Sequence, residues 1–226
     1  MYVLPVNEYV LENFPGLRLT PPLFYNWQIG IRFEIGVGYN VNAAYLHSPY
    51  IDNAYKRAVT LFKSLHADDD DIFVIADAVG GFGGGRGYKS KLHLFSRYIR
   101  EKAVLKKLQH IAVSYTCSDD DDKTHRFFLR CKAGDVRYIP MLRAICNQDM
   151  GIKPSISQDI YFINIKKRTI FHLYDDRGCD ILAAAAETIR DMYETYNSWI
   201  LDYDREKINR HFEPLRGREF NTSIKG

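Results

Sequence analysis

The stretch DIYFINIKKRTIFHLY, residues 159–174, decides the fold class. Each half is rich in β-branched and aromatic residues, and the polar pair Lys166-Lys167 separates the halves. This pattern predicts two strands joined by a tight turn, that is, an antiparallel hairpin. Upstream, residues 29–35 alternate apolar and polar side chains, as in a half-buried strand. Residues 72–79, IFVIADAV, form a nearly continuous apolar run that is typical of a buried strand.

Between these strands, apolar residues recur three and four positions apart, as on one face of a helix. Such stripes predict helices over 49–66, about 92–108, 140–148 and 187–200, and a last short helix with Asp204 as its N-cap. Residues 111–116 and 125–131 predict two more strands. We therefore expect an α+β fold with a mixed, partly antiparallel sheet and helices packed on at least one face. Residues 1–22 are expected to be a loosely attached N-terminal segment, and residues 23–226 a single α+β domain.

Composition excludes several classes of protein. The 226 residues are 46% hydrophobic and 26% charged, as in a globular chain, which excludes a disordered tail and a fibrous repeat. The four cysteines (117, 131, 146 and 179) form no C-x-x-C motif, which excludes a zinc ribbon and a thioredoxin-like site. The chain shows neither a signal peptide nor an apolar run near the ~20 residues that cross a bilayer. We expect a cytoplasmic protein with reduced, buried thiols, no membrane partner and no cofactor or metal.

A basic segment follows a glycine-rich loop in the middle of the chain. Six glycines fall within residues 80–87, but their spacing fits neither G-x-G-x-x-G nor the phosphate-loop pattern. Residues 86–107 then carry eight cations and one acid, so this segment has a charge of +7 and the rest of the chain −4. The candidate binding residues are Arg86, Tyr88, Lys89, Lys91, Arg97, Arg100 and Lys106.

Tyr88, Phe95 and Tyr98 are interleaved with these cations, a pattern that favours an anionic partner, either an acidic protein or nucleic acid. The alternative is a solvated helix face whose charge is balanced by the aspartate runs at 68–71 and 119–122.

The turn after the hairpin is the second candidate site. Its polar residues are His172, Asp175, Asp176, Arg177, Gly178 and Asp180. Three carboxylates near a histidine suggest a metal-dependent hydrolase, if they converge with His172 or Asp202 in a cleft. The alternative is that these residues have a purely structural role, because Asp and Gly favour tight turns and Arg177 can pair with the neighbouring carboxylates.

Four stretches carry a family resemblance: 26–36, 55–75, 156–183 and 187–206. Together they resemble the bacterial domain-of-unknown-function family 3885, over about residues 23–212. The resemblance marks Asp175, Asp176, Arg177 and Gly178 as the family signature. It implies a bacterial cytosolic protein, and it brings no activity, cofactor or catalytic residue with it. The leading hypothesis is a non-catalytic binding module of open oligomeric state. A hydrolase and a toxin-neutralising or regulatory interaction protein are the alternatives.

Overall fold

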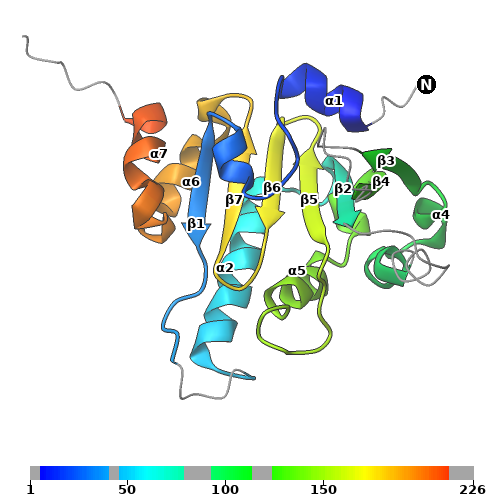
Figure 1. Ribbon diagram of the computed structural model, residues 1–226, viewed down its shortest axis with the longest axis horizontal. Coiled ribbons are helices and arrows are strands. Elements are labelled where there is room, and N and C mark those ends of the chain that lie inside the picture. The colour runs from blue at the N-terminus through cyan, green and yellow to red at the C-terminus, as the bar shows by residue number, and fades with distance from the viewer. Residues whose placement is uncertain (1–5, 41–45, 79–92, 114–123, 214–226) are drawn as a thin grey trace, which may run out of the picture.

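The computed structural model describes residues 6–40, 46–78, 93–113 and 124–213. Within these ranges seven strands form one sheet, in the order β1-β7-β6-β5-β2-β4-β3 (Figure 1). The strands are β1 (Gly30–Glu34), β2 (Asp71–Ala78), β3 (Gln109–Val113), β4 (Thr124–Lys132), β5 (Asp159–Asn164), β6 (Thr169–Leu173) and β7 (Gly178–Ala183).

The predicted hairpin is confirmed, because β5 and β6 pair antiparallel with Phe162 opposite Phe171. The α+β class is confirmed too. The expectation of a mixed sheet is wrong: every pair of neighbouring strands that the structure describes runs antiparallel. The interleaving of helices and strands along the chain suggested a mixed sheet, but helices between strands can also connect antiparallel neighbours. The apolar run of β2 is buried on both faces of the sheet, as expected for it.

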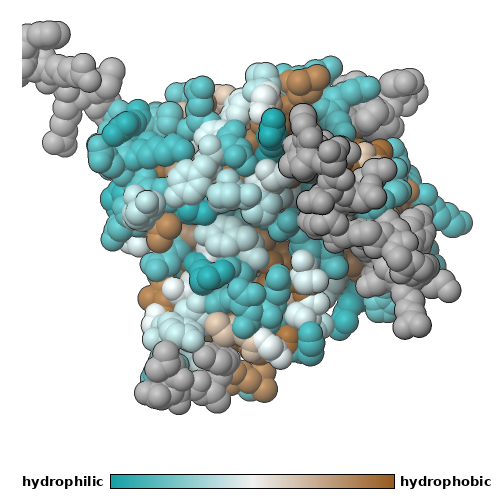
Figure 2. All heavy atoms as spheres, viewed as in Figure 1, coloured by the Kyte–Doolittle hydropathy of each residue, from teal (hydrophilic) through white to brown (hydrophobic). Residues whose placement is uncertain are grey.

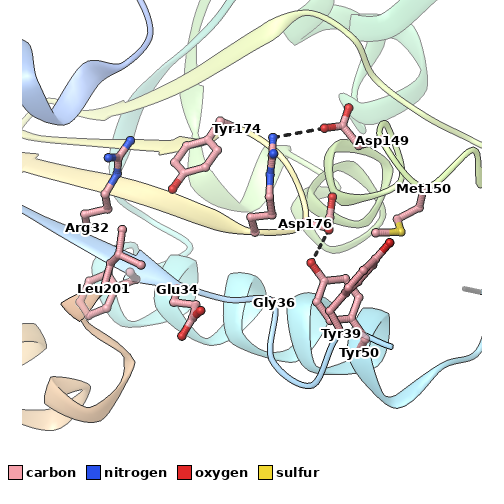
Figure 3. Close-up of a pocket in the computed structure, with 12 residues that line it drawn as sticks. Arg32, Glu34, Gly36, Tyr39, Tyr50, Asp149, Met150, Tyr174, Asp176 and Leu201 are labelled. Carbon is pink, nitrogen blue, oxygen red and sulfur yellow. Dashed lines mark hydrogen bonds and ion pairs between the residues drawn. The ribbon is translucent and has the colours of Figure 1, made fainter. Parts of the chain in front are cut away.

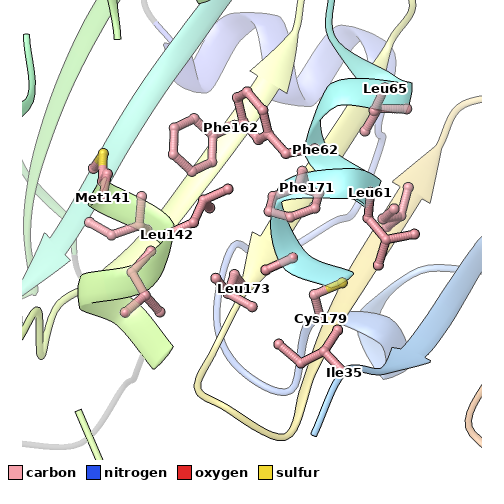
Figure 4. Close-up of a cluster of buried hydrophobic side chains, with 14 of the residues drawn as sticks. Ile35, Leu61, Phe62, Leu65, Met141, Leu142, Phe162, Phe171, Leu173 and Cys179 are labelled. Carbon is pink, nitrogen blue, oxygen red and sulfur yellow. The ribbon is translucent and has the colours of Figure 1, made fainter. Parts of the chain in front are cut away.

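One face of the sheet is covered by α2 (Pro49–Leu65) and α5 (Tyr138–Cys146). Phe62 on α2 lies at the centre of this core and contacts Phe162 and Phe171 edge-on, with ring centroids 5.0 and 5.4 Å apart (Figure 4). Ser48 caps α2, its side chain accepting a hydrogen bond of 3.3 Å from the Ile51 N–H. The predicted amphipathic pattern of 49–66 therefore packs as expected.

The other face is covered by α1 (Val6–Asn13) and the short 3-10 helix η1 (Leu23–Asn26). Val6 and Phe14 are fully buried, and Tyr9 contacts Phe73 of β2 with ring centroids 5.7 Å apart. Residues 6–19 thus pack onto the sheet, whereas we expected a loosely attached segment. The reason is that β2, β4 and β5 carry large apolar side chains on this face, which α1 removes from water.

Two predicted helices are shorter than the sequence suggested. In the segment expected to be helical over 92–108, residues 93–98 are helical, the chain then bridges to Val136 at Ile99, and α4 follows (Lys102–Leu105). In 187–200 the chain forms η3 (Ala186–Ile189), α6 (Arg190–Thr195) and η4 (Asn197–Trp199). At the first break a backbone bond to another element replaces the helical one, because Arg100 N–H donates to the Asp135 carbonyl. At the second break the bonds become three-residue turns, with Trp199 N–H donating to Tyr196 and Ile200 N–H to Asn197.

The two edges of the sheet differ. Along β1 lie η5 (Asp202–Asp204) and α7 (Arg205–Phe212), with Ile208 and Phe212 buried as predicted for a last short helix. Along β3 and β4 lie α4 and η2 (Ala133–Asp135). On the face in Figure 2, hydrophilic residues predominate and hydrophobic ones form small groups. No helix among the described residues is long and apolar enough to cross a membrane. Cys131, Cys146 and Cys179 are buried free thiols, and Cys117 lies outside the described residues.

Candidate functional site

A cleft opens where the signature turn joins β6 to β7, beside the end of β1 and the first turn of α2. We call it the turn cleft; its volume is about 700 Å³. Among its lining residues are Arg32, Tyr39, Tyr50, Asp149, Asp176 and Arg177 (Figure 3). These residues are up to 145 positions apart, so only the fold brings them together.

The signature turn is held by its own side chains. Asp175 accepts a hydrogen bond of 2.8 Å from the Arg177 N–H, and its second oxygen accepts the Arg177 guanidinium. The Arg177 carbonyl accepts the Ile35 N–H at 2.9 Å, which ties the turn to β1. A β-carbon at Gly178 would lie 2.8 Å from the Phe33 carbonyl oxygen and would also overlap the Tyr174 hydroxyl. Glycine is therefore required here by close packing.

Asp176 has a different partner from Asp175, and its side chain bonds to α2. The Tyr50 hydroxyl donates to Asp176 Oδ2 at 2.5 Å, and both residues are buried. Asp176 Oδ1 is buried and has no hydrogen-bond partner among the residues that the structure describes. Burial raises the pKa of the Asp176 carboxyl above its usual value. The Cβ of any residue other than glycine at position 36 would lie 2.6 Å from the Asp176 carbonyl oxygen, so Gly36 allows this close approach.

The side chain of Asp180 points to the face of the sheet that η1 covers. Its carboxylate accepts Arg32 Nε at 3.1 Å and the Phe24 N–H at 2.9 Å. Arg32 also reaches Asp204 at 3.3 Å, and the Tyr25 hydroxyl donates to Asp204 at 2.9 Å. Asp204 stands at the N-cap of α7 as predicted, yet its side chain makes no cap hydrogen bond, because its carboxylate binds these partners instead. Burial raises the pKa of Asp180 to about 6, against the opposing effect of Arg32.

His172 takes no part in the cleft. It is fully buried, neither ring nitrogen has a hydrogen-bond partner within the described ranges, and its ring stacks on Tyr161 with ring centroids 4.5 Å apart. Burial and the nearby Arg32 lower the pKa of His172 to about 3. Asp202 is also elsewhere, exposed and paired with Arg205 at 2.7 Å.

The hydrolase hypothesis required these side chains to converge, and they point apart. Within the described part of the chain, no group of three or more His, Cys, Asp or Glu side chains could hold a metal ion.

The basic segment lies at the far edge of the sheet, next to β3 and β4. Arg97, Arg100 and Lys106 are exposed, as a binding role requires. Arg86, Tyr88, Lys89, Lys91 and the glycine-rich loop lie outside the described residues. The proposed contact residues Phe95 and Tyr98 are buried in the core, at 1% and 4% exposure, so that part of the prediction is wrong. Phe95 and Tyr98 lie among cations in the sequence, but their three-residue spacing puts both on the side of the helix that faces the core.

Two hollows border this segment. One, of about 420 Å³, is lined by Arg100, Lys102, Lys106 and Arg137 among others. The second, of about 640 Å³, shares Lys106 and adds Lys107, together with Arg130 and Lys132, which pair with Asp71. We call the exposed cations without such a pair the basic surface: Arg97, Arg100, Lys102, Lys106, Lys107 and Arg137.

The chain has sequence relatives. The family model described as Domain of unknown function (DUF3885) matches residues 6–204. The chain belongs to the DUF3885 family. A relative is the "Uncharacterized protein YnaE" of Bacillus subtilis (strain 168), which is 29% identical over 214 residues, covering 86% of this chain and 96% of that protein. No solved structure matches the chain.

The family resemblance is thus confirmed, and the structure adds what the sequence could not supply for this DUF3885 chain. Tyr39, Tyr50 and Asp149 line the turn cleft, and Arg137 joins the basic surface. None of these four residues belongs to a sequence motif, because each is distant in sequence from the other residues of its site. The β6 strand before the turn and the β3 strand beside the basic surface are separated by β5, β2 and β4, roughly 19 Å at the usual strand spacing. The two regions are therefore separate sites.

Proposed function

We propose that this DUF3885 chain is a non-catalytic binding module of the bacterial cytoplasm, which binds an acidic protein through its basic surface. The observation that carries the proposal is an imbalance of charge. Within the described ranges, none of the six cations of the basic surface has an ion pair with a carboxylate. Glu101 is the one acid among residues 93–109. Uncompensated charge of one sign attracts a partner of the opposite sign and speeds its association.

Local backbone bonds hold this surface in place. Arg137 N–H donates to the Tyr98 carbonyl at 2.7 Å, and Arg100 Nε donates to the Gly134 carbonyl at 2.9 Å. The segment 97–107 is thereby fixed against η2 and the start of α5. A preorganised surface loses less conformational entropy on binding than a flexible one.

Two features favour a protein over nucleic acid. The described aromatics of the segment, Phe95 and Tyr98, are buried, so they offer no ring for stacking on a base. The hollows also combine cations with the half-buried apolar side chains of Val104, Leu105 and Leu108. Such amphipathic hollows suit carboxylate side chains with their methylene groups.

The proposal is tested with poly-L-glutamate and a DNA duplex of matched charge, by fluorescence anisotropy at two salt concentrations. The Lys102→Glu/Lys106→Glu variant reverses two exposed cations, and Lys56→Glu/Lys63→Glu makes the same change on the exposed side of α2. We expect salt-dependent binding of poly-L-glutamate that the first variant loses and the second retains. Equal binding by both variants would overturn the proposal. Tighter binding of the duplex would assign the surface to nucleic acid instead.

A further inference from the structure

The turn cleft holds a buried negative charge that its neighbours leave uncompensated. Asp176 is 2% exposed, and within the described residues it has no ion pair. Tyr50 satisfies Oδ2, while no described residue donates to Oδ1. A buried acceptor without a donor is unfavourable, typically by ~1–3 kcal/mol, so a ligand that supplies an N–H here recovers that energy.

The two arginines of the cleft are already neutralised. Arg32 pairs with Asp180 and Asp204, at 3.1 and 3.3 Å. Arg177 pairs with Asp175 and with Asp149, the latter at 3.3 Å. Each guanidinium therefore faces two carboxylates, and the net charge that remains around the cleft is negative. This argues for a cationic ligand and against a carboxylate or phosphate.

Aromatic rings stand next to Asp176. Tyr39 and Tyr50 meet edge to face, with ring centroids 5.3 Å apart and planes at 75°. Figure 3 shows these two rings together beneath Asp176, with the Met150 side chain beside them. Two rings at a steep angle with a carboxylate at one end form the arrangement that holds an ammonium group by cation–π attraction.

We propose that the turn cleft binds an alkylammonium group, as carried by a lysine side chain or a polyamine, with Asp176 as its counter-ion and Tyr39 and Tyr50 as its walls. Tyr39 is 53% exposed, so its ring is the wall of the site that faces solvent. This site is independent of the basic surface, because it takes a ligand of opposite charge at another part of the sheet.

The test is an NMR titration of the full chain with two probes, the methylamide of Nα-acetyl-lysine and spermidine. n-Butanol serves as the uncharged control and acetate as the anionic one. We expect both amines, but neither control, to shift signals of the cleft residues. Tighter binding of spermidine would identify a polyamine site, and comparable binding of the lysine derivative a site for a partner's lysine.

Variants decide which groups carry the binding. Asp176→Asn is expected to weaken amine binding about tenfold or more, since a charge-assisted hydrogen bond is lost. Asp191→Asn, the same change at an exposed position on α6, should leave it unchanged. Tyr39→Phe should retain binding, while Tyr39→Leu should weaken it about two- to fivefold.

If Asp176→Asn fails to fold, the comparison of Tyr39→Phe with Tyr39→Leu still tests the proposal. The proposal is overturned if the amines shift no cleft signal, if n-butanol or acetate binds as well as they do, or if folded Asp176→Asn and Tyr39→Leu bind like the parent.

Discussion

Arg32 on β1 lies directly opposite Asp180 on β7, with Arg32 Nε 3.1 Å from Asp180 Oδ1. The same cross-strand row continues to His172 on β6 and Tyr161 on β5. These four polar residues form a line across the face that η1 and α1 cover. Arg32 is half-buried and the other three are buried, so the ion pair at one end and the uncharged histidine beside it depend on the sheet register.

Removing one partner of this pair should be costly. Asp180→Ala leaves the Phe24 N–H without its buried acceptor, and leaves Arg32 with Asp204 as its remaining carboxylate. We expect a loss of about 1–3 kcal/mol in the free energy of unfolding. Asp202→Ala removes an exposed ion pair with Arg205 and should cost under about 1 kcal/mol. Urea unfolding followed by circular dichroism gives both values. Similar losses in the two variants would contradict the assignment.

Gly178→Ala tests the close packing of the signature turn. The added methyl group meets the Tyr174 hydroxyl and the Phe33 carbonyl oxygen, so we expect a destabilisation of about 1–3 kcal/mol. A second change, Tyr174→Phe, should recover part of this loss because it removes the hydroxyl. Gly134→Ala, whose nearest neighbour would be 3.1 Å away, should cost less. Thermal unfolding ranks the variants, and a neutral Gly178→Ala would show that the turn tolerates a side chain.

The buried His172 should make the protein sensitive to mild acid. Its pKa is lowered to about 3 in the folded state by burial and by Arg32, whereas the unfolded side chain titrates near pH 6.5. Below pH 6.5 the unfolded chain therefore binds a proton that the folded chain does not, and stability falls as the pH falls. Between pH 7 and pH 5 this amounts to about 2 kcal/mol.

His172→Phe should remove that part of the pH dependence and keep the stacking on Tyr161. His66, whose pKa burial lowers to about 4, retains its own contribution of the same sign in both proteins. Denaturant unfolding at pH 7 and pH 5 measures the difference. Equal acid sensitivity in the parent and His172→Phe would place the effect elsewhere.

The buried thiols should resist alkylation until the chain unfolds. Cys131, Cys146 and Cys179 are buried, and burial raises the pKa of each thiol, that of Cys131 to about 12. Because the thiolate is the reactive form, iodoacetamide at pH 8 should modify these three slowly in the native protein and fully in urea. Mass spectrometry of the digested protein reports each cysteine separately. Fast labelling of Cys146 in the native state would contradict its burial against the sheet.

Several features could be predicted from the sequence because they depend on local patterns. The 159–174 hairpin, the amphipathic 49–66 helix and the membership of the family each follow from stretches of neighbouring residues. Strand direction could not be predicted this way, since an apolar run reports burial and not the orientation of its neighbours. The break at Ile99 was missed as well, because a distant backbone group replaces the helical hydrogen bond next to it, where Arg100 N–H donates to the Asp135 carbonyl.

The sequence by itself determined the α+β class, the family and the uneven charge along the chain. Only the tertiary structure decided that Asp175, Asp176 and Asp180 point in three directions, and that Tyr39, Tyr50 and Asp149 gather around one of them. The physical reason is that alternate residues of a strand face opposite sides of the sheet, while a turn rotates the chain between them. Carboxylates that are adjacent in sequence therefore reach separate environments.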